Sequence, residues 1–313
     1  MIPTILCCLM AVAGMSTEYD IAKTTATDST AKQSTVNYDE LTMAWHDEFE
    51  GTQVDMTKWN YRALGTTRTF GVVDKRTIEV DGQGFLHIKV LKEEPTGTYY
   101  IGEIGTQKLF SQKYGYFECR AKMNTSLGPH VAFWLQSPTM SQVGDPATNG
   151  AEIDIFEYHC RTPNIVYHNI HWDGYGTDHK TAGMKVTYPQ ITDGFHTFGL
   201  KWTPCAYTFY IDGKETWTCT VGVSQRDEYL ILSTELNGWG GDPKLGTFPD
   251  EVVFDYVRVY KFNDITGISQ QTISTNKSVS HAIYSIDGSY VGTQLNSLQK
   301  GIYIQDGKKI LVN

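Results

Sequence analysis

The sequence predicts an all-β fold, an antiparallel sandwich followed by a small C-terminal β-module. From residue 41 to residue 262, short runs of Val, Ile, Phe, Tyr and Trp alternate with polar residues and are separated by Gly, Asp, Asn and Pro. This pattern is typical of strands joined by turns. Helical periodicity is nearly absent. With 313 residues, 40% of them hydrophobic, the chain is long enough to bury a full core.

The first 14 residues are expected to be a signal peptide. Residues 2–10 are mostly apolar and residues 11–14 are small, although no Lys or Arg precedes them. A lipidated Cys7 or Cys8 is the alternative. Residues 15–37 are rich in Thr, Ser and Ala and predict a flexible spacer. No later run is long enough to span a membrane as a helix, so a secreted or cell-surface protein is expected.

A hairpin is predicted over residues 207–220, with its turn at Asp212-Gly213. Cys205 and Cys219 flank this hairpin, and a disulfide between them is one expectation. Buried thiols are expected for Cys119 and Cys160. A cysteine zinc site is not expected, because the chain has no C-x-x-C pair.

Residues 152–157 read E-I-D-I-F-E and place three carboxylates in a segment that otherwise resembles a buried strand. On a regular strand Glu152 and Asp154 share one face, whereas Glu157 points to the other face. A β-bulge at Ile155-Phe156 would add one residue and return Glu157 to the face of the other two acids. The sequence therefore predicts three acids on one wall.

Three acids on one wall suit the cleavage of glycosidic bonds. Hydrolysis with retention needs a nucleophilic carboxylate and a protonated carboxyl about 5–5.5 Å apart. Asp154 would influence which carboxyl keeps a proton, because neighbouring acids cannot all ionise freely. The plainer interpretations are a polar strand face or a calcium-binding edge. The apolar residues between the acids argue against both, since unpaired buried acids are costly.

The acidic run and its surroundings resemble family 16 of the glycoside hydrolases, in the branch with the bulged signature E-x-D-x-x-E. Seven further segments match in order and extend the resemblance over about residues 38–262. They are W-H-D-E-F at 45–49, D-G-Q-G-F-L-H-I at 81–88, Y-G-Y-F-E-C-R-A-K at 114–122, A-F-W-L at 132–135, F-H-T-F-G-L-K-W at 195–202, Y-I-D-G-K at 210–214 and F-D-Y-V-R-V-Y at 254–260.

The resemblance implies a concanavalin A-like jelly roll of two curved antiparallel sheets, with the polysaccharide substrate along the concave sheet. It implies that Glu152 is the nucleophile, that Glu157 is the general acid and then base, and that Asp154 is their electrostatic partner. No cofactor is expected for catalysis, and a monomer is expected.

Four further residues are candidates for substrate binding. Trp134 matches a tryptophan that similar enzymes use as a sugar platform. His171 and Trp172 lie one strand beyond the acids, where a strand pairing would bring them to the same cleft; for His171 a core imidazole is the alternative. Trp239 lies among glycines that permit close approach of a chain, and a surface loop is its alternative.

The resemblance also implies a structural calcium site remote from the acids. Asp255 matches a calcium-binding position, and Glu48 and Gly82 would supply backbone carbonyls to this hard cation. The alternative for Asp255 is an ion pair with Arg258.

Residues 263–313 differ in character from the rest and predict a small β-module of two alternating strand pairs with Asp-Gly turns. The end of this segment resembles the C-terminal sorting domain of the type IX secretion system, although it is shorter than usual. A partner in a bacterial secretion or surface-anchoring machinery is therefore expected. A small carbohydrate-binding module is the alternative, which the absence of Trp disfavours.

The substrate is expected to be a neutral β-1,3- or mixed-linkage β-1,3-1,4-glucan cut internally. The net charge is −9 and no run of basic residues occurs, which argues against nucleic acid and against a basic cleft for sulfated glycans. Laminarin-cleaving relatives usually show G-x-W-P-A-F-W, whereas His130-Val131 replaces Trp-Pro in this chain. An agar- or porphyran-type β-galactan hydrolase, a transglycosylase and a non-catalytic lectin are the alternatives.

Overall fold

A computed structural model describes residues 35–263, 283–285, 290–305 and 308–312. The predicted signal peptide and the predicted spacer up to residue 34 lie outside the described residues. The chain divides into two compact units, with the boundary after Phe262.

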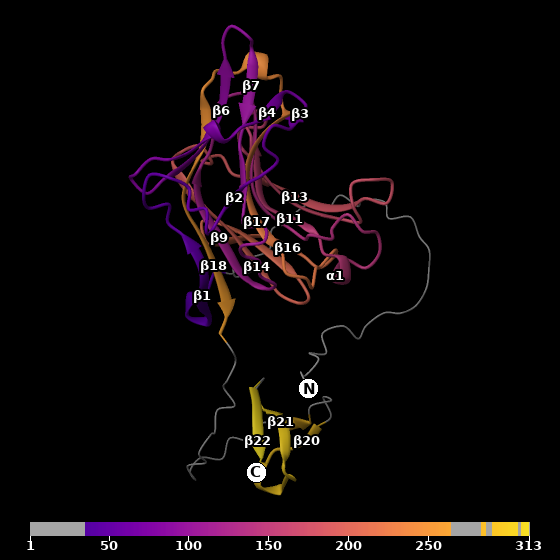
Figure 1. Ribbon diagram of the computed structural model, residues 1–313. Helices are drawn as coiled ribbons and strands as arrows, with labels where there is room; N and C mark the ends of the chain where they lie inside the picture. The colour runs from indigo at the N-terminus through magenta and orange to yellow at the C-terminus, as the bar shows by residue number, and fades with distance from the viewer. Residues whose placement is uncertain (1–34, 264–282, 286–289, 306–307, 313) are drawn as a thin grey trace. The chain divides into compact units, whose positions relative to one another are not determined.

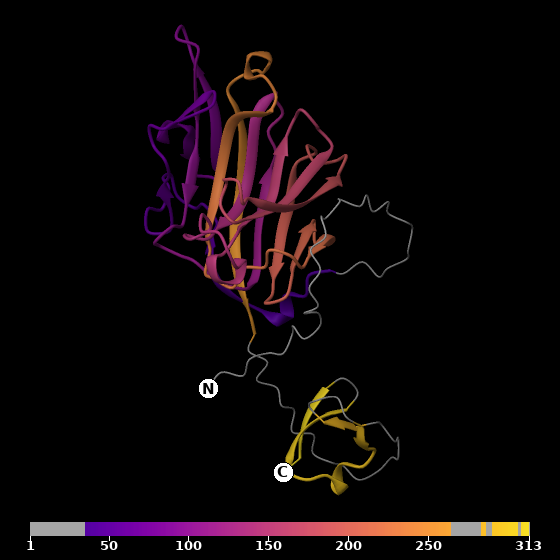
Figure 2. The ribbon, with the colours of Figure 1, turned by 90° about the vertical axis from the view of Figure 1, so that its right-hand side faces the viewer.

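The first unit contains two large sheets, which Figures 1 and 2 show as the layers of a sandwich. In the described residues the larger sheet, called the outer sheet here, has eleven strands. Their spatial order is β16 (Lys214–Cys219), β15 (Tyr207–Ile211), β14 (Phe195–Trp202), β9 (Gly115–Lys122), β18 (Asp250–Phe262), β6 (Leu86–Glu93), β7 (Thr98–Ile101), β4 (Gly71–Val73) and β3 (Thr67–Arg68), with β1 (Leu41–Asp47) beside β18 and β5 (Ile78–Val80) beside β6.

The second large sheet, called the cleft sheet here, has seven strands in the described part of the chain. Their order is β13 (Lys180–Thr187), β12 (Ile165–Trp172), β11 (Glu152–His159), β10 (Gly128–Gln136), β17 (Tyr229–Gly240), β8 (Glu103–Gly105) and β2 (Asn60–Tyr61). Pairings within both sheets are antiparallel except that of β4 with β7. The predicted antiparallel sandwich is confirmed.

The core lies between the two sheets, because each strand turns its alternate apolar residues inward. Phe156 on β11 packs on Phe198 of β14 with ring centroids 4.2 Å apart, and it also contacts Phe254 of β18. Trp59 is fully buried, and its indole N–H donates to Asp47 Oδ2 at 2.7 Å. Aromatic side chains thus join the two layers together with many Ile, Val and Leu residues.

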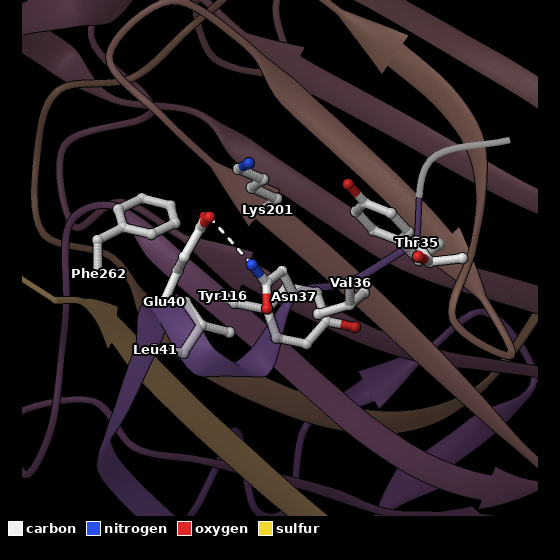
Figure 3. Close-up of a pocket in the computed structure, with 9 residues that line it drawn as sticks. Thr35, Val36, Asn37, Glu40, Leu41, Tyr116, Lys201 and Phe262 are labelled. Carbon is white, nitrogen blue, oxygen red and sulfur yellow. Dashed lines mark hydrogen bonds between the residues drawn. The ribbon is translucent and has the colours of Figure 1, made fainter. Parts of the chain in front are cut away.

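The segment before β1 packs on the outer sheet. Thr35 bridges to Lys214, and Val36 packs on a cluster of tyrosines that includes Tyr116, so residues 35–37 belong to the folded unit and not to a spacer. Figure 3 shows the small pocket that this segment lines. Glu40, whose carboxylate accepts from Asn37 at 3.0 Å, is the one carboxylate among the lining residues, so the pocket lacks the acid pair of a glycosidase.

The predicted hairpin is confirmed as β15 and β16, with Asp212 and Gly213 both at positive φ in the turn. The predicted disulfide across it is wrong. Tyr207 is the residue opposite Cys219, Cys205 lies before the strand begins, and the four described cysteines are all thiols. The Cys219 thiol instead donates to the Val221 carbonyl at 3.5 Å.

The second unit is a four-stranded sheet in its described residues, in the order β20 (Tyr290–Gly292), β19 (Ile283–Ser285), β21 (Gly301–Gln305) and β22 (Lys308–Val312). The two predicted strand pairs are confirmed. The Asp-Gly turns predicted between their strands lie outside the described residues.

Helical elements are short throughout the described chain. They are η1 (Tyr38–Glu40), η2 (Lys75–Thr77), α1 (Pro146–Asn149), η3 (Pro243–Leu245) and η4 (Leu295–Ser297). A search of the described residues finds no helix with the length and apolarity needed to cross a membrane.

Candidate active site

The three acids lie on β11, and this strand carries the predicted bulge. Along β10, Phe133 is paired with Phe156 and the next residue, Trp134, is paired with Asp154. One residue of β11, Ile155, is therefore extra. Ile155 and Phe156 are both fully buried in the core, while Glu152, Asp154 and Glu157 all line one cleft. The bulge predicted from the spacing of the acids is confirmed.

The bulge has a buried hydrogen-bond partner. His168 on β12 is fully buried, and its Nδ1 lies 2.6 Å from the Ile155 carbonyl oxygen. Burial lowers the pKa of His168 to about 4, so the ring is neutral at pH 7 and its Nδ1–H donates to that carbonyl. The bond satisfies a carbonyl group that an unpaired bulge residue would leave without a partner in the core.

The cleft has a volume of about 400 Å³ on the exposed face of the cleft sheet. Strands β10, β11 and β17 form its floor, because each of them presents every second side chain to the cleft. The residues that line the cleft are Arg62, Arg68, His130, Ala132, Trp134, Gln136, Glu152, Asp154, Glu157, Tyr175, Ser233, Glu235 and Asn237.

Glu152 is held by two donors at one end of the acid row. Gln136 Nε2 donates to its Oε2 at 3.1 Å, and the Tyr175 hydroxyl donates to the same oxygen. Burial, and next the charge of Asp154, raise the pKa of Glu152 to about 8, although the Tyr175 bond acts in the opposite direction.

Asp154 is the central acid and is almost inaccessible to solvent. Burial, and next the charge of Glu157, raise the pKa of Asp154 well above its usual range. His171 Nε2 lies 3.4 Å from its Oδ2. Asp154 is therefore the group of the row on which a proton is most firmly held.

Glu157 lies between a histidine and an asparagine at the other end of the acid row. His130 Nε2 lies 2.9 Å from its Oε1, and the Asn169 amide donates to Oε2. Burial acts to raise the pKa of Glu157, but these two contacts and the nearby His171 outweigh it, so the pKa falls below its usual value. Before a substrate binds, the negative charge of the row therefore rests on Glu157.

A family model described as glycosyl hydrolases family 16 matches residues 72–258, which hold the acid row and all of the cleft sheet except β2. The chain belongs to glycosyl hydrolase family 16. Most of the segments on which the resemblance was based lie within this match.

Relatives of this family 16 chain include enzymes that act on different polysaccharides. A glucan endo-1,3-β-glucosidase of Niallia circulans is 28% identical over 71% of this chain and 38% of its own length. A keratan-sulfate endo-1,4-β-galactosidase of Sphingobacterium multivorum is also 28% identical, over 77% of this chain and 60% of its own length. This chain therefore matches less than two thirds of either relative.

Solved structures give the same family 16 fold. The structure of an endo-β-1,3-glucanase from Pyrococcus furiosus is 27% identical, with a TM-score of 0.61, over 71% of this chain and 95% of that chain.

Two of the four predicted sugar-binding residues lie beside the acids of the family 16 cleft. Trp134 lines the cleft and is anchored by an indole N–H bond to Ser233 Oγ at 3.1 Å. His171 lies on β12 opposite Glu152 and next to Asp154. The alternative for His171, a core imidazole, does not hold, because the residue is only partly buried and faces the acid row.

The other two predicted sugar-binding residues do not line the cleft. Trp172 follows His171 on the same strand and so points to the opposite face, where it packs against the core. Trp239 packs edge-on against the rings of His130 and His159 and at a tilt against that of Tyr167, at centroid distances of 4.8, 4.7 and 4.7 Å. Trp239 thus packs behind His130 and is not among the residues that line the cleft, and its role in substrate binding stays a prediction.

Several cleft residues were not predicted from the sequence as site residues, chiefly His130, Gln136, Asn169 and Tyr175. For the residues of β10, the sequence does contain a pattern that predicts their place in the cleft. Alternation from Trp134 places His130, Ala132 and Gln136 on the same face, and these residues are paired with His159, Glu157 and Glu152 of β11. The position of Asn169 depends on the register of its strand, and that of Tyr175 on the conformation of a loop. Neither follows from the local sequence.

Two arginines line one end of the cleft, and both are paired with acids. Arg62 and Arg68 bind the buried Glu103, and Arg68 also binds Glu235. The formal charges of these two arginines and two glutamates sum to zero. The cleft therefore has no uncompensated basic patch there of the kind that a sulfated polymer would favour.

The two acidic residues of the predicted calcium site are bound to arginines. The Asp255 carboxylate pairs with Arg120, and Glu48 accepts two bonds from Arg258, at 2.9 and 2.8 Å. The expected alternative, an Asp255–Arg258 pair, is therefore wrong. Arg120 occupies one oxygen of the Asp255 carboxylate, and the role of Asp255 in a calcium site stays a prediction. The calcium site with the Glu48 and Gly82 carbonyls stays a prediction.

The Tyr175 hydroxyl is expected to help keep Glu152 ionised. The loop that carries Tyr175 is fixed by Asp173, which is buried and accepts from Gly144 N at 2.9 Å and from Lys180 Nζ at 2.6 Å. In Tyr175→Phe the lost donor should raise the pKa of Glu152 further, so the acidic limb of the kcat/KM profile should move to higher pH. Tyr188→Phe, whose hydroxyl bonds Asp212 away from the cleft, is the matched control. An unmoved acidic limb in Tyr175→Phe would contradict this role.

Proposed function

We propose that this chain is a retaining endo-acting glycoside hydrolase that cleaves a β-linked polysaccharide. The observation that carries the proposal is the bulged strand β11, which aligns three carboxyl groups along one wall of an open cleft. An open cleft accepts the middle of a long polymer, and paired carboxyl groups supply the acid and the nucleophile that the reaction requires.

In the proposed reaction the Glu152 carboxylate attacks the anomeric carbon while Glu157 donates a proton to the leaving glycosidic oxygen. The C–O bond breaks and a glycosyl ester of Glu152 forms. Glu157, now ionised, takes a proton from water, whose oxygen attacks the anomeric carbon and releases Glu152 as a carboxylate. No cofactor takes part in this proposal.

The first step needs a proton on Glu157, whereas the charge rests there before a substrate binds. Asp154 holds a proton and lies between the two glutamates along β11, so it can pass its proton to Glu157 and take one from Glu152, and it ends protonated itself. When Asp154 is protonated, its charge no longer opposes the ionisation of Glu152, and the donors Gln136 and Tyr175 then favour the Glu152 carboxylate. We propose that substrate binding, by displacing water from the row, moves the proton towards Glu157.

The proposed substrate is a neutral β-1,3- or mixed-linkage β-1,3-1,4-glucan. The compensated arginines at the cleft end support a neutral polymer, and the glucanase names of relatives support a glucan. A β-galactan is the second candidate. Two observations favour it: a relative named as a β-galactosidase matches equally well, and His130 stands where laminarin-cleaving relatives are expected to have tryptophan.

The test is a panel of laminarin, barley β-glucan, lichenan, agarose, porphyran and keratan sulfate, with products resolved by size. We expect new reducing ends and oligosaccharides of intermediate length from the glucans. Products from the galactans alone would select the second candidate. Elongated products would indicate a transglycosylase, and binding without any product would indicate a lectin.

We also propose that the protein is exported and that residues 263–313 are a sorting signal for a type IX secretion machinery. The proposal rests on the sequence resemblance of this segment and on the separate four-stranded sheet of its described residues. A chain lacking residues 263–313 should keep the turnover of the full chain, because the cleft is built entirely from the first unit, and should fail to reach the cell surface in a host with this machinery. A large loss of turnover would contradict the proposal.

A further inference from the structure

Two hydrogen bonds and one close polar contact connect the loop end of β17 with Glu157. The backbone N–H of Trp239 donates to Asn237 Oδ1 at 3.0 Å. This bond fixes the orientation of the Asn237 amide, because only the oxygen can accept. The Asn237 Nδ2 group then faces His130 Nδ1 at 3.1 Å.

The amide orientation determines the tautomer of His130. Asn237 Nδ2 can only donate, so His130 Nδ1 must accept, and the proton of the neutral imidazole lies on Nε2. Nε2 is the atom 2.9 Å from Glu157 Oε1. The nitrogen of His130 that carries the proton therefore lies in close polar contact with the carboxyl group that the proposed reaction uses as acid and base, without the alignment of a hydrogen bond.

The His130 ring is held rigidly in this direction. It is only 8% exposed. The indole of Trp239 packs against it in an edge-to-face arrangement, with a centroid distance of 4.8 Å and an interplanar angle of 70°. Trp239 is itself supported by His159 and Tyr167. Trp239 thus supports His130 twice, through its backbone bond to Asn237 and through its ring.

We propose that His130 is a positioning residue, which aligns Glu157 in the cleft and favours its ionised form through a tautomer that Asn237 and Trp239 impose. The proposal rests on the proposed function, because the consequence for turnover depends on Glu157 acting as acid and base. A donor on the ionised carboxylate strengthens its hold on charge, and so eases proton release from Glu157 and opposes proton uptake.

Other charged or titratable groups near Glu157 are Asp154 on its own strand, His171 on β12, His159 beside His130, and Glu235 on β17. Glu235 is bound by Arg68, and burial, followed by the proximity of His130, lowers the pKa of His159 to about 4, so His159 is neutral at pH 7. None of these side chains is substituted in the variants below, and burial, the larger cause, still lowers the pKa of His159 when His130 is replaced, so a changed profile is attributable to the His130 contact.

Three variants separate alignment from general packing. His130→Phe keeps a ring against Trp239 and removes the donor. His130→Gln supplies an amide N–H for Glu157 and an oxygen for Asn237. Asn237→Asp keeps an acceptor for Trp239 N–H but cannot donate to Nδ1, so His130 gains a proton there and becomes the cation nearest to Glu157.

The readouts are the alkaline limb of kcat/KM on the best polysaccharide and the titration of Glu157 followed by carboxyl-carbon NMR in the full chain. His130→Phe should move both to higher pH by about one unit, the expected effect of one bond to a charged group. His130→Gln should restore the wild-type values. Asn237→Asp should move both to lower pH.

The proposal would be overturned if the wild type, His130→Phe and Asn237→Asp had the same alkaline limb of kcat/KM and the same titration of Glu157. Shifts of the same sign in both variants would also overturn it. If His130→Phe fails to fold, the opposite-signed shift of Asn237→Asp and the rescue by His130→Gln still test it. If the wild type cleaves no glycan, the proposed function fails, while the NMR titration still decides whether His130 controls Glu157.

Discussion

Replacing Glu152 or Glu157 by Gln is expected to lower kcat on polysaccharide by about 10³-fold or more. General acid–base catalysis alone contributes roughly 10²–10⁴-fold, and loss of the nucleophile removes the covalent route entirely. The two variants should differ on an aryl glycoside with a good leaving group. Glu157→Gln should still form the glycosyl ester from that substrate, because little protonation is needed, whereas Glu152→Gln should be inactive on both.

The matched control is Glu118→Gln. Glu118 is a buried carboxylate of the outer sheet, and it accepts bonds from the hydroxyls of Tyr38, Tyr116 and Tyr256. Its replacement is expected to lower the thermal unfolding midpoint while kcat stays within about twofold. Full activity of either cleft variant, or an equal loss in the control, would contradict the roles proposed for the acid row.

His168→Leu is expected to destabilise the first unit by about 1–3 kcal/mol at pH 8, because the buried Ile155 carbonyl of the bulge loses its partner. All seven tryptophans lie between residues 45 and 239, so denaturant unfolding followed by tryptophan fluorescence reports on this unit. Because the bulge positions Glu157, we also expect kcat to fall more than the loss of folded protein explains.

The same substitution has a pH signature. The pKa of His168 is about 4 in the folded chain and about 6.5 when unfolded, so the unfolded chain binds the extra proton between these values. The stability that wild type has above pH 6.5 is therefore lost as pH falls towards 4, by about 3 kcal/mol if this group acts alone. His168→Leu lacks this titration, so its stability gap to wild type should narrow from pH 8 to pH 4.

His168→Gln separates the two effects of His168. Its amide N–H is able to donate to the Ile155 carbonyl but does not titrate, so the variant should lose less stability than His168→Leu at pH 8 and show the same weakened pH dependence. A stability gap between wild type and His168→Leu that stays constant from pH 8 to pH 4 would show that His168 does not remain neutral in the fold.

Local patterns were enough to predict much of the fold. The parity of the acids at 152, 154 and 157 predicted the bulge, because side-chain direction alternates strictly along a strand. Asp212-Gly213 predicted the hairpin turn, because both positions need positive φ. These inferences depend only on neighbours in sequence, and the structure confirms both.

Features that depend on strand register or on loops were missed or wrong. His130 reaches Glu157 only because β10 is paired with β11 in one register, and Tyr175 reaches Glu152 from a loop. Trp172 was assigned to the cleft with His171, although adjacent strand residues cannot share a face. Trp239 packs on rings brought together from three other elements, which no local pattern reveals.

The configuration of a rescued product tests the roles of Glu152 and Glu157 most directly. Alanine variants of each would be incubated with an activated aryl β-glycoside and azide, and the glycosyl azide analysed by proton NMR. We expect the β-azide from Glu157→Ala, because azide then attacks the glycosyl ester of Glu152, and the α-azide from Glu152→Ala, because azide occupies the place of the missing nucleophile. The α-azide from Glu157→Ala and the β-azide from Glu152→Ala would contradict the proposal and reverse the two roles.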